Sequence, residues 1–460
     1  MIQSINPANG QVVGDYAIHS PAVVDAILSG ATAAQARWRY ADVADRSALL
    51  TAIARQLRAD KAELAGLITA EMGKPLAEAA AEVEKCALNC DYYAEAGPGF
   101  IADVPVTGVE GVSLVFDPLG VVLAIMPWNY PLWQVFRFVA PALMAGNGII
   151  LKHAANVSGC AEAIGRTLAR AGVPHGLFGH LLIEADRVAA VIEDERIAAV
   201  TLTGSTEVGM IVAAQAGRML KKQVLELGGS DPFVVLADAD LDQAARVAVQ
   251  ARFTNAGQSC VNAKRFIVEA SVADAFVDRF AAAVGQLVVG DPLDPSTTIG
   301  PMARANLRAA LDAQVQRSIA AGARLLVGGS AVDGDGFFYR PTLLDGVVPG
   351  MAAFDEETFG PAGAIIRAAS AEEAIQLANR TAFGLGASLW TSDLDRAARL
   401  ARSVDAGAVF VNAMVASDPR VPFGGIKQSG YGRELGAHGL QEFTNMKTLK
   451  MLAPEQGKAA

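Results

Sequence analysis

The sequence predicts an α/β fold made of two domains with parallel sheets and a small additional unit of β structure. The chain has 460 residues, more than one hydrophobic core ordinarily holds, so two or three packed units are expected. Short apolar runs alternate with helical patterns from Val121 onward, which is typical of buried parallel strands between helices. This alternation stops and restarts at Gly228-Gly229, which predicts a boundary between two such domains.

The first hundred residues predict helices. Apolar residues recur at intervals of three and four from Ala48 to Leu67 and again from Leu76 to Tyr93. The segment from Gly73 to Pro75 separates the two stretches. Residues Phe100–Phe116 then alternate apolar and polar side chains around turn glycines, which predicts a β-hairpin.

The apolar runs between residues 117 and 228 predict a Rossmann-like open sheet. The runs along this part of the chain and just beyond it are Val121–Met126, Gly148–Leu151, His180–Ile183, Ala198–Leu202, Val224–Leu227 and Phe233–Leu236. Residues 229–435 predict a second α/β domain, which starts with a helix at Leu241–Thr254 and a strand near Arg265–Val268. A strand at Met446–Leu452 joins the hairpin in a small β platform, whose exposed edges suit a contact between subunits.

The composition excludes several classes of protein. Hydrophobic residues make up 52% of the chain and charged residues 19%, which argues against a disordered or fibrous protein. A net charge of −10 disfavours nucleic-acid binding, which needs a basic face. We find no apolar stretch long enough to cross a membrane and no secretory signal in residues 1–10. Four cysteines and five histidines form neither a disulfide framework nor a metal-binding pattern, so we expect a cytoplasmic protein without a metal.

Two residues suggest covalent chemistry. Cys260 follows Gly257-Gln258-Ser259, at a junction between a helix and a strand where nucleophiles are usually displayed. Glu226 ends an apolar run, and burial would raise the pKa of its carboxyl and make it a good base near neutral pH. Each has an ordinary alternative: Cys260 as a small buried side chain, and Glu226 as a strand-end residue that reaches solvent or a salt bridge.

Two further segments lie at the expected carboxyl edge of the first sheet, where ligands bind in doubly wound folds. Asn129, within Pro127–Pro131, either caps the following helix or donates its amide to a developing oxyanion. Gly204 and Ser205 open a helix after a strand, which is a natural phosphate site. Their spacing matches neither G-x-G-x-x-G nor a Walker A sequence.

Together these segments resemble the aldehyde dehydrogenase superfamily over nearly the whole chain. The matching segments, in family order, are Pro127–Pro131, Lys152, Gly204–Gly209, Glu226–Gly229, Gly257–Cys260, Glu357–Pro361 and Pro422–Gly430. The resemblance implies a cofactor domain of residues 1–99 and 117–228 and a catalytic domain of residues 229–435. It also implies an oligomerisation platform of residues 100–116 and 436–460.

The resemblance also implies a reaction: NAD(P)-dependent oxidation of an aldehyde to an acid through a thioester on Cys260. Glu226 is then the base that activates water, and Asn129 with the Cys260 backbone N–H forms the oxyanion site. The implied cofactor contacts are Trp128, Lys152, Ala155, Gly204, Ser205, Glu357 and Phe359. Among these, Lys152 and Glu357 contact riboses, Ser205 contacts a phosphate, and Phe359 packs near the nicotinamide ribose.

One departure from the family pattern bears on the cofactor. After Lys152 the family often has Pro-Ser-Glu, and that Glu binds the ribose 2′-hydroxyl. This chain has His153-Ala154-Ala155 at the same positions. Without the carboxylate a 2′-phosphate meets no like charge and can pair with Lys152. We therefore expect NADP to be accepted, with NAD as the alternative cofactor.

Within the superfamily the chain is similar to bacterial succinate-semialdehyde dehydrogenases. Arg137 and Ser417 stand where those enzymes carry an Arg and a Ser that hold the substrate carboxylate, and Gln134 shares the helix face of Arg137. The similarity implies a small aldehyde with a distal carboxylate, succinate semialdehyde, and a homodimer or homotetramer. A second Arg that some relatives carry six residues before the nucleophile is replaced by Thr254.

Three alternatives stay open. A broad-specificity aldehyde dehydrogenase for small aliphatic or aromatic aldehydes would use Arg137 only structurally. A CoA-acylating enzyme is disfavoured by Glu226, because it needs no deacylating base. A non-catalytic structural relative is disfavoured because Cys260, Glu226 and Asn129 are all intact.

Overall fold

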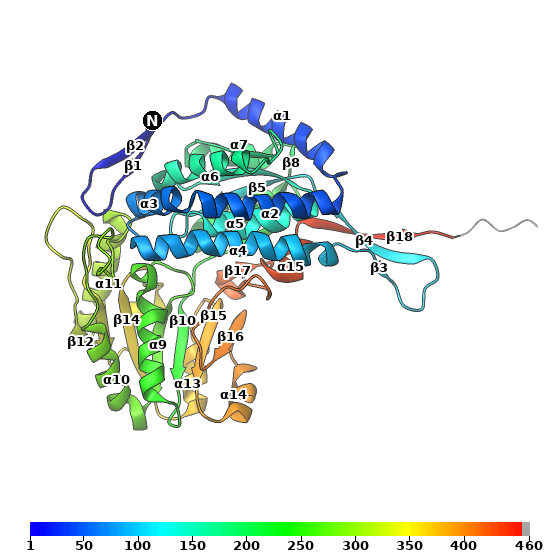
Figure 1. Cartoon of the computed structure of the whole chain (residues 1–460). Helices are drawn as coiled ribbons and strands as arrows, with labels where there is room; N and C mark the ends of the chain where they lie inside the picture. The colour runs from blue at the N-terminus through cyan, green and yellow to red at the C-terminus, as the bar shows by residue number, and fades with distance from the viewer. Residues whose placement is uncertain (453–460) are drawn as a thin grey trace, which may run out of the picture.

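The computed structural model describes residues 1–452 and contains two α/β domains, one above the other, with an arm of β structure at one side (Figure 1). The chain starts with an antiparallel hairpin, β1 (Ile2–Ile5) and β2 (Val12–Tyr16), followed by α1 (Pro21–Trp38). The predicted helix 48–67 is in fact two, α2 (Val43–Ala59) and α3 (Lys61–Met72). They separate at Asp60, whose carboxylate is held by Thr167 and Arg170 at 2.9 and 2.8 Å.

The first domain is built on a six-stranded sheet in the order β17-β9-β8-β5-β6-β7. Its parallel strands are β5 (Val121–Met126), β6 (Gly148–His153), β7 (Phe178–His180), β8 (Ile197–Thr203) and β9 (Lys222–Glu226). The helices between them are α5 (Trp133–Ala145), α6 (Ser158–Arg170), α7 (Val188–Glu193) and α8 (Thr206–Arg218). A strand was predicted at 180–183. The observed strand β7 lies at 178–180, where it pairs with residues 149–151 of β6.

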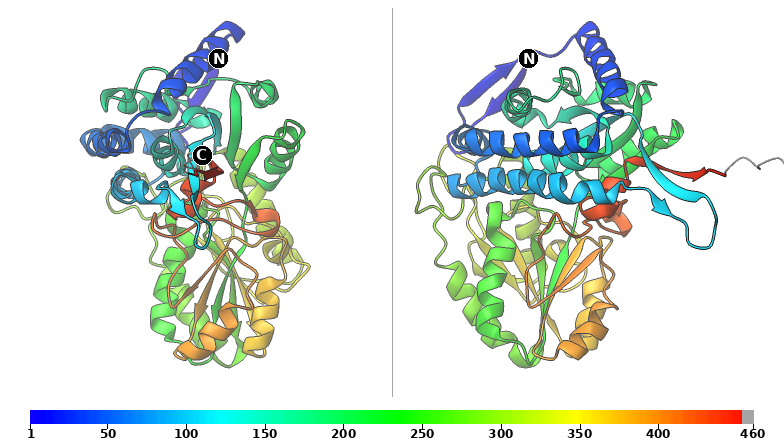
Figure 2. Two further views of the ribbon diagram at one scale, coloured as in Figure 1. Left: turned by 90° about the vertical axis from the view of Figure 1, so that its right-hand side faces the viewer. Right: turned by 45° about the vertical axis from the view of Figure 1, so that its right-hand side comes forward.

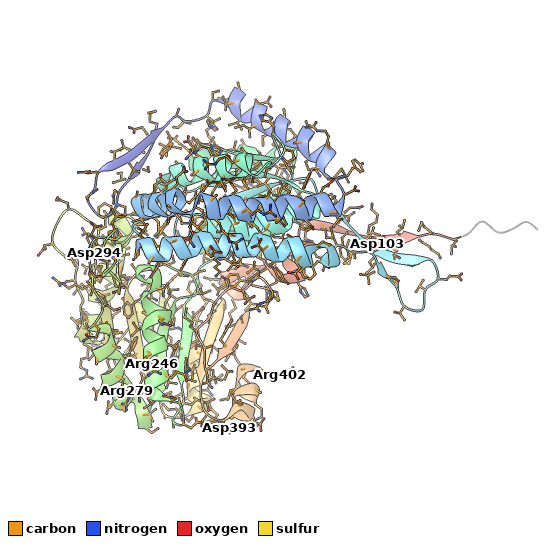
Figure 3. The ribbon with its side chains drawn as sticks, viewed as in Figure 1. Asp103, Arg246, Arg279, Asp294, Asp393 and Arg402 are labelled. Carbon is orange, nitrogen blue, oxygen red and sulfur yellow. The ribbon has the colours of Figure 1, made fainter. Side chains whose placement is uncertain are left out.

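The second domain has a seven-stranded sheet in the order β12-β13-β14-β11-β10-β15-β16. Its strands are β10 (Asp231–Val235), β11 (Ala263–Glu269), β12 (Arg324–Val327), β13 (Thr342–Asp345), β14 (Ala362–Ala368), β15 (Gly386–Trp390) and β16 (Ala408–Val411). Its helices are α9 (Leu241–Phe253), α10 (Ala270–Val284), α11 (Ala305–Ala320), α12 (Ala352–Asp355), α13 (Ala371–Asn379) and α14 (Leu394–Ala401). Charged side chains such as Arg246 and Arg279 point outward from α9 and α10, as amphipathic helices covering a sheet require (Figure 3).

The third unit is the arm, a three-stranded sheet in the order β18-β4-β3. It consists of β3 (Val104–Pro105), β4 (Val112–Pro118) and β18 (Thr444–Lys450), and it projects from the body in Figure 1 and in the right view of Figure 2. The predicted hairpin and tail strand therefore do pair, in full register from Thr444↔Pro118 to Lys450↔Val112. The last residues of the predicted platform, 453–460, lie outside the described residues.

Two strands cross the domain boundaries that were predicted from the sequence. Residues 430 and 431, expected in the second domain, form β17 and pair with β9 of the first sheet. Strand β4 runs to Pro118, so the arm extends past residue 116. The long helix α4 (Leu76–Phe100) leads into the arm, and α15 (Gly436–Gln441) leads back to it.

The order of the strands determines where a site can form. The polypeptide leaves the first sheet at Glu226, the carboxyl end of β9, and enters the second at Asp231, the amino end of β10. Because parallel strands share their direction, the carboxyl edge of the first sheet faces the amino edge of the second. Residues that follow β5, β6 and β8 therefore meet residues that precede β11 and β14.

Candidate active site

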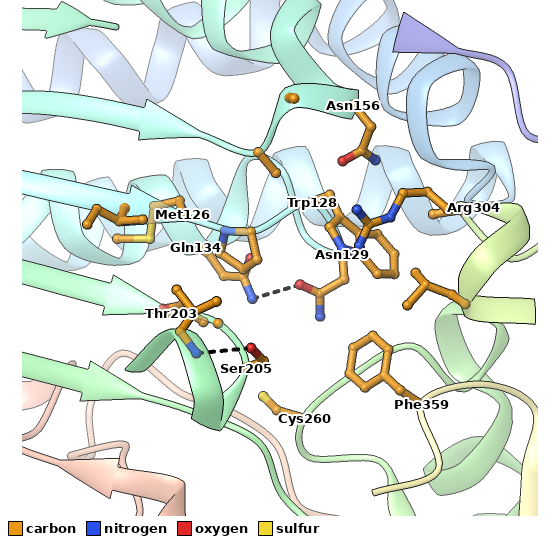
Figure 4. Close-up of a pocket in the computed structure, with 18 of the residues that line it drawn as sticks. Met126, Trp128, Asn129, Gln134, Asn156, Thr203, Ser205, Cys260, Arg304 and Phe359 are labelled. Atoms are coloured by element: carbon orange, nitrogen blue, oxygen red, sulfur yellow. Dashed lines mark hydrogen bonds between the residues drawn. The ribbon is translucent and has the colours of Figure 1, made fainter. Parts of the chain in front are cut away.

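A cavity of about 940 Å³ lies between these two sheet edges (Figure 4). Ten of the residues that line it were predicted site residues: Trp128, Asn129, Gln134, Lys152, Ala155, Gly204, Ser205, Cys260, Glu357 and Phe359. The remaining three predicted site residues, Glu226, Arg137 and Ser417, do not line this cavity. The predicted cofactor contacts are thus brought together in one space with the predicted nucleophile.

Cys260 lies in a tight loop between α9 and β11. Gly257 has a φ of 71°, and a Cβ at this position would run into the carbonyl oxygen of Gly360, so only glycine fits. The buried guanidinium of Arg252 donates to the carbonyl oxygens of both glycines, at 2.7 Å for Gly257. These bonds tie the nucleophile loop to the loop that carries Phe359, so the two loops are positioned together.

The Cys260 thiol is partly exposed, yet its surroundings disfavour the thiolate. Burial raises the pKa of the thiol to about 11, the charges of Arg137 and Lys264 lower it, and Glu226 raises it further. A thiol with this pKa is protonated at neutral pH and is a poor nucleophile until its proton is removed. The charges of Arg137 and Glu226 therefore both act on the ionisation of this thiol.

The structure distinguishes between the two roles considered for Asn129. The first N–H groups of α5 donate to the carboxylate of Glu82, both at 2.9 Å, so Glu82 and not Asn129 caps this helix. The Asn129 oxygen instead accepts from Gln134 Nε2 at 3.1 Å, and its Nδ2 donates to the Gln258 carbonyl at 3.0 Å. The amide is thereby fixed with its N–H groups toward the Cys260 loop (Figure 4).

Glu226, the last residue of β9, is 2% exposed, and neither carboxylate oxygen has a hydrogen-bond partner among the described residues. The alternative of a strand-end Glu reaching solvent is therefore wrong. Burial raises the pKa of this carboxyl well above its usual value; Arg137 opposes the rise and Glu434 adds to it. Gly424 packs against it so closely that a Cβ there would lie 2.6 Å from Oε1. A buried carboxyl with a raised pKa and free oxygens is suited to accepting a proton.

Lys152 lines the cavity as a partly buried cation that forms no ion pair within residues 1–452, and burial lowers its pKa. The neighbouring His153 turns away from the cavity: Nε2 lies 2.8 Å from the Pro131 carbonyl and Nδ1 lies 3.1 Å from that of Met126. Burial lowers the pKa of His153 to about 4, so this ring is neutral. His153 therefore adds no charge to the predicted ribose site, where Lys152 is a cation and Ala154 and Ala155 are small.

The other end of the cavity is shaped by Glu357, Phe359 and Trp128. Glu357 Oε1 accepts from the Gly229 N–H at 3.0 Å and lies 3.4 Å from Lys264 Nζ, which fixes the carboxylate at the cavity wall. The Trp128 and Phe359 rings meet edge to face with 5.8 Å between their centres. A carboxylate beside two aromatic faces matches the role expected for a ribose and nicotinamide site.

Ser205 is the N-cap of α8, where its Oγ accepts from the Val208 N–H at 3.4 Å (Figure 4). Gly204 and Ser205 therefore present a helix N-terminus to the cavity, as predicted for a phosphate site. Asn156 also lines the cavity, and its buried Nδ2 has no hydrogen-bond partner among the described residues. A donor without a partner in the cavity that Lys152 also lines fits an anionic ligand there.

Arg137 does not project into the cavity. It is 2% exposed and pairs with buried Glu434, while Nη2 donates to Thr203 Oγ1 at 3.2 Å and the guanidinium lies 4.9 Å from the centre of the Phe423 ring. The alternative in which Arg137 pairs with a surface acid is wrong, because its acid is buried. Thr203 does line the cavity, so Arg137 lies directly behind the cavity wall.

Ser417 lies in the loop that follows β16, and its Oγ accepts from Lys85 Nζ at 2.8 Å. Gln134 lines the cavity, and its neighbour Trp133 lies under the same lysine. Thr254, at the position where some relatives have a second Arg, turns its hydroxyl back to the Gln250 carbonyl at 2.8 Å.

Several residues at the site were missed by the sequence analysis: Glu82, Lys85, Asn156, Arg252 and Arg304. Asn156 could have been found, because it directly follows Ala155 after β6. Arg304 lies 5.5 Å from the centre of the Trp128 ring, but it reaches the cavity from the start of α11, and no local pattern marks it. Glu82 and Lys85 lie on α4, far along the chain from the residues they contact.

Within residues 1–452, no helix is long and apolar enough to cross a membrane. The same part of the chain holds no group of three or more His, Cys, Asp or Glu side chains able to bind a metal ion. All four cysteines are free thiols.

Known proteins are similar to this chain in both sequence and structure. The profile described as Aldehyde dehydrogenase family matches residues 1–449. An NAD(P)+ succinate semialdehyde dehydrogenase from Escherichia coli K12 is 49% identical over 448 residues, which are 97% of each chain. A protein from Synechocystis, named as a probable succinate-semialdehyde dehydrogenase using NADP+, is 50% identical and covers 97% of this chain and 99% of its own.

The structural similarity is equally extensive. The crystal structure of succinic semialdehyde dehydrogenase from Streptococcus pyogenes with NADP+ matches with a TM-score of 0.96 and 37% identity, covering 98% of this chain and all of that one (100%). That of succinate-semialdehyde dehydrogenase from Burkholderia pseudomallei matches with a TM-score of 0.94 and 37% identity, covering 97% of this chain and 93% of the other. The expected α/β architecture with a Rossmann-like first domain is thus confirmed.

Proposed function

The chain belongs to the aldehyde dehydrogenase family, and from that premise we propose that it oxidises succinate semialdehyde to succinate with NADP or NAD as the hydride acceptor. The observation that carries the reaction is the convergence of Cys260, Asn129 and the predicted cofactor contacts on one cavity. The substrate is supported by relatives named as succinate-semialdehyde dehydrogenases at 47–50% identity.

The proposed acylation starts when the Cys260 thiol loses its proton to solvent, because the thiolate is the nucleophile. The sulfur attacks the carbonyl carbon, a C–S bond forms, and the aldehyde oxygen becomes an oxyanion. Asn129 Nδ2, whose orientation is fixed by Gln134, and the backbone N–H of Cys260 donate to that oxyanion. A bound nicotinamide supplies the acceptor for the hydride that then leaves the carbon, and a thioester remains on the sulfur.

Glu226 is the proposed base of the second half-reaction. Its carboxylate takes a proton from water, the hydroxyl attacks the thioester carbon, and the C–S bond breaks to release the acid and the thiolate. The raised pKa of Glu226 supports this role, because a stronger base accepts the proton more readily. Its two oxygens have no competing hydrogen bonds among the described residues.

For the cofactor we propose that Lys152 pairs with a 2′-phosphate and that Glu357 holds the nicotinamide ribose. The unpaired charge of Lys152 and the orphaned amide of Asn156 support NADP, and Ser205 at the start of α8 is suited to the diphosphate. No carboxylate lies at position 155 to repel the extra phosphate.

The experiment that tests the substrate compares kcat/KM for succinate semialdehyde with that for butanal, an uncharged aldehyde of the same chain length, with NADP and with NAD. The proposal predicts a preference of about tenfold or more for the charged substrate, the range of one charge-assisted hydrogen bond. Equal values for the two aldehydes would contradict it. They would favour the second candidate, a broad-specificity aldehyde dehydrogenase, which the internal pairing of Arg137 with Glu434 also suits.

We also propose a homodimer or homotetramer of a cytoplasmic enzyme, assembled through the arm. Its strand β18 exposes apolar side chains, with Met446 at 63% and Leu449 at 37% exposure. An exposed edge of this kind favours pairing with a second copy. Met446→Glu should therefore shift the mass measured by light scattering toward the monomer, and an unchanged mass would contradict assembly through this strand.

A further inference from the structure

Lys85, on α4, is a half-buried cation in an unusual position. Its ammonium donates to Ser417 Oγ at 2.8 Å and lies 4.3 Å from the centre of the Trp133 ring. No carboxylate within residues 1–452 forms an ion pair with it. Burial, and then the charge of Arg137, lower the pKa of Lys85 to about 8, as expected for an ammonium without a counter-ion.

The acids that act on Lys85 are already engaged elsewhere. Glu82 forms a buried ion pair with Lys74 and caps α5, and Asp418 lies 2.5 Å from the Arg420 guanidinium. Neither carboxylate is free to neutralise the lysine. An unpaired positive charge in a partly buried position raises the free energy of the folded protein. Such charges are typical of functional sites, where a ligand supplies the opposite charge.

Arg137 is in the opposite situation, because Glu434 balances its charge and Thr203 and Phe423 enclose its guanidinium. A substrate carboxylate at Arg137 would compete with a buried acid that is already paired. Arg137 nevertheless influences the pKa of both Cys260 and Lys85, so it lies within electrostatic range of each. The geometric link between Lys85 and the cavity of Cys260 is Trp133, whose ring lies under Lys85 and whose neighbour Gln134 lines that cavity.

We propose that Lys85, and not Arg137, is the charged residue that binds the distal carboxylate of the substrate. Ser417 is the second donor, since its Oγ accepts from Lys85 and its own hydrogen remains free for the carboxylate. Trp133 forms the wall of this subsite, beside Gln134 in the catalytic cavity. The inference rests on the proposed function, oxidation of an aldehyde that carries a carboxylate. It names the residue that selects this substrate.

The test measures kcat/KM for succinate semialdehyde and for butanal in the wild type, Lys85→Met, Lys85→Arg and a control, Lys61→Met. Lys61 is a cation one helix away, 39% exposed and paired with Glu84, so its loss controls for long-range charge. Lys85→Met should lower the value for succinate semialdehyde about 10- to 100-fold, the range of a charge-assisted hydrogen bond, and leave that for butanal nearly unchanged. Lys85→Arg should restore part of the loss, and Lys61→Met should change neither value.

The outcomes separate this inference from the function on which it rests. A wild type without preference for the charged aldehyde overturns the proposed substrate and the inference with it. A preference that survives Lys85→Met, or an equal loss on both aldehydes, overturns only the role of Lys85. A collapse of the preference in Arg137→Met but not in Lys85→Met would return the carboxylate to Arg137.

The wild type offers a second readout that needs no substitution. The ratio of the two kcat/KM values cancels the titration of Cys260, and it should fall as the pH rises above about 8, because Lys85 then loses its charge. Among the other groups that face Lys85, burial raises the pKa of Cys86, and the bond to Arg420 lowers that of Asp418 to about 2, so neither changes charge near pH 8. The remaining two, Glu82 and Arg137, are in ion pairs. A ratio that stays constant from pH 7 to 9.5 would overturn the proposal.

Discussion

The buried pair of Lys74 and Glu82 allows a sharp prediction about how α4 supports the oxyanion site. Both side chains are 1% exposed. Glu82 also accepts from the first N–H groups of α5 at 2.9 Å, and Lys74 lies 3.7 Å from the centre of the Tyr130 ring, next to Asn129. Lys74→Met would leave the Glu82 carboxylate buried without its cation. Removing one partner of a buried pair costs about 3–5 kcal/mol, so the free energy of unfolding should fall by that amount.

A second substitution makes this reasoning testable. In the double variant Lys74→Met/Glu82→Gln, the amide oxygen can still accept from α5, and the charge of Glu82 is removed together with that of Lys74. The double variant should therefore be more stable than Lys74→Met alone, although it carries more changes. Urea unfolding followed by circular dichroism measures both, and the burst of NADPH formation reports whether Asn129 keeps its position. A double variant that is less stable than Lys74→Met would refute the argument from unpaired charge.

Three further predictions concern the chemistry. Ala155→Glu adds a carboxylate beside Lys152, so KM for NADP should rise about tenfold or more relative to KM for NAD; an unchanged ratio would mean that this loop does not face the 2′-phosphate. Gly424→Ala places a Cβ 2.6 Å from Glu226 Oε1, so steady-state turnover should fall about 10- to 100-fold while the first turnover persists, and loss of both would point to a wider disturbance. The thiol pKa of about 11 means that the rate of the first turnover should rise with pH between 6 and 9, as the thiolate fraction grows; a flat profile would mean that the thiol is already ionised.

The general architecture could be predicted because its signals are local. Parallel strands buried on both faces give continuous apolar runs, and the predicted run Val121–Met126 coincides with β5. Lys152, Gly204 and Ser205, which were predicted as cofactor contacts at or after strand ends, line one cavity. The two-residue strand β17 could not be predicted, because it exists only through its pairing with β9.

The partners of the charged residues could not be predicted from the sequence. Arg137 was expected to meet a substrate, but Glu434, about 300 positions later, is its partner, and only the packing of α5 against the C-terminal segment brings them together. In the same way the cap of α5 comes from Glu82 on α4, so the choice between the two roles of Asn129 could not be made from local sequence. Contacts between residues far apart in the chain determine these roles, and local sequence patterns do not reveal those contacts.

The central claim is a two-step reaction. Cys260 first forms a thioester, and Glu226 then activates the water that releases the acid. The most direct measurement is rapid-mixing absorbance of NADPH formation by Glu226→Gln, with the wild type and Cys260→Ala alongside. Because acylation does not need this base, the variant should release one equivalent of NADPH per active site at a rate close to that of the wild type. Turnover should then slow by about 10²–10⁴-fold, the usual contribution of a general base. Cys260→Ala should show no burst at all. Linear turnover by Glu226→Gln at the wild-type rate, without a burst, would contradict the account.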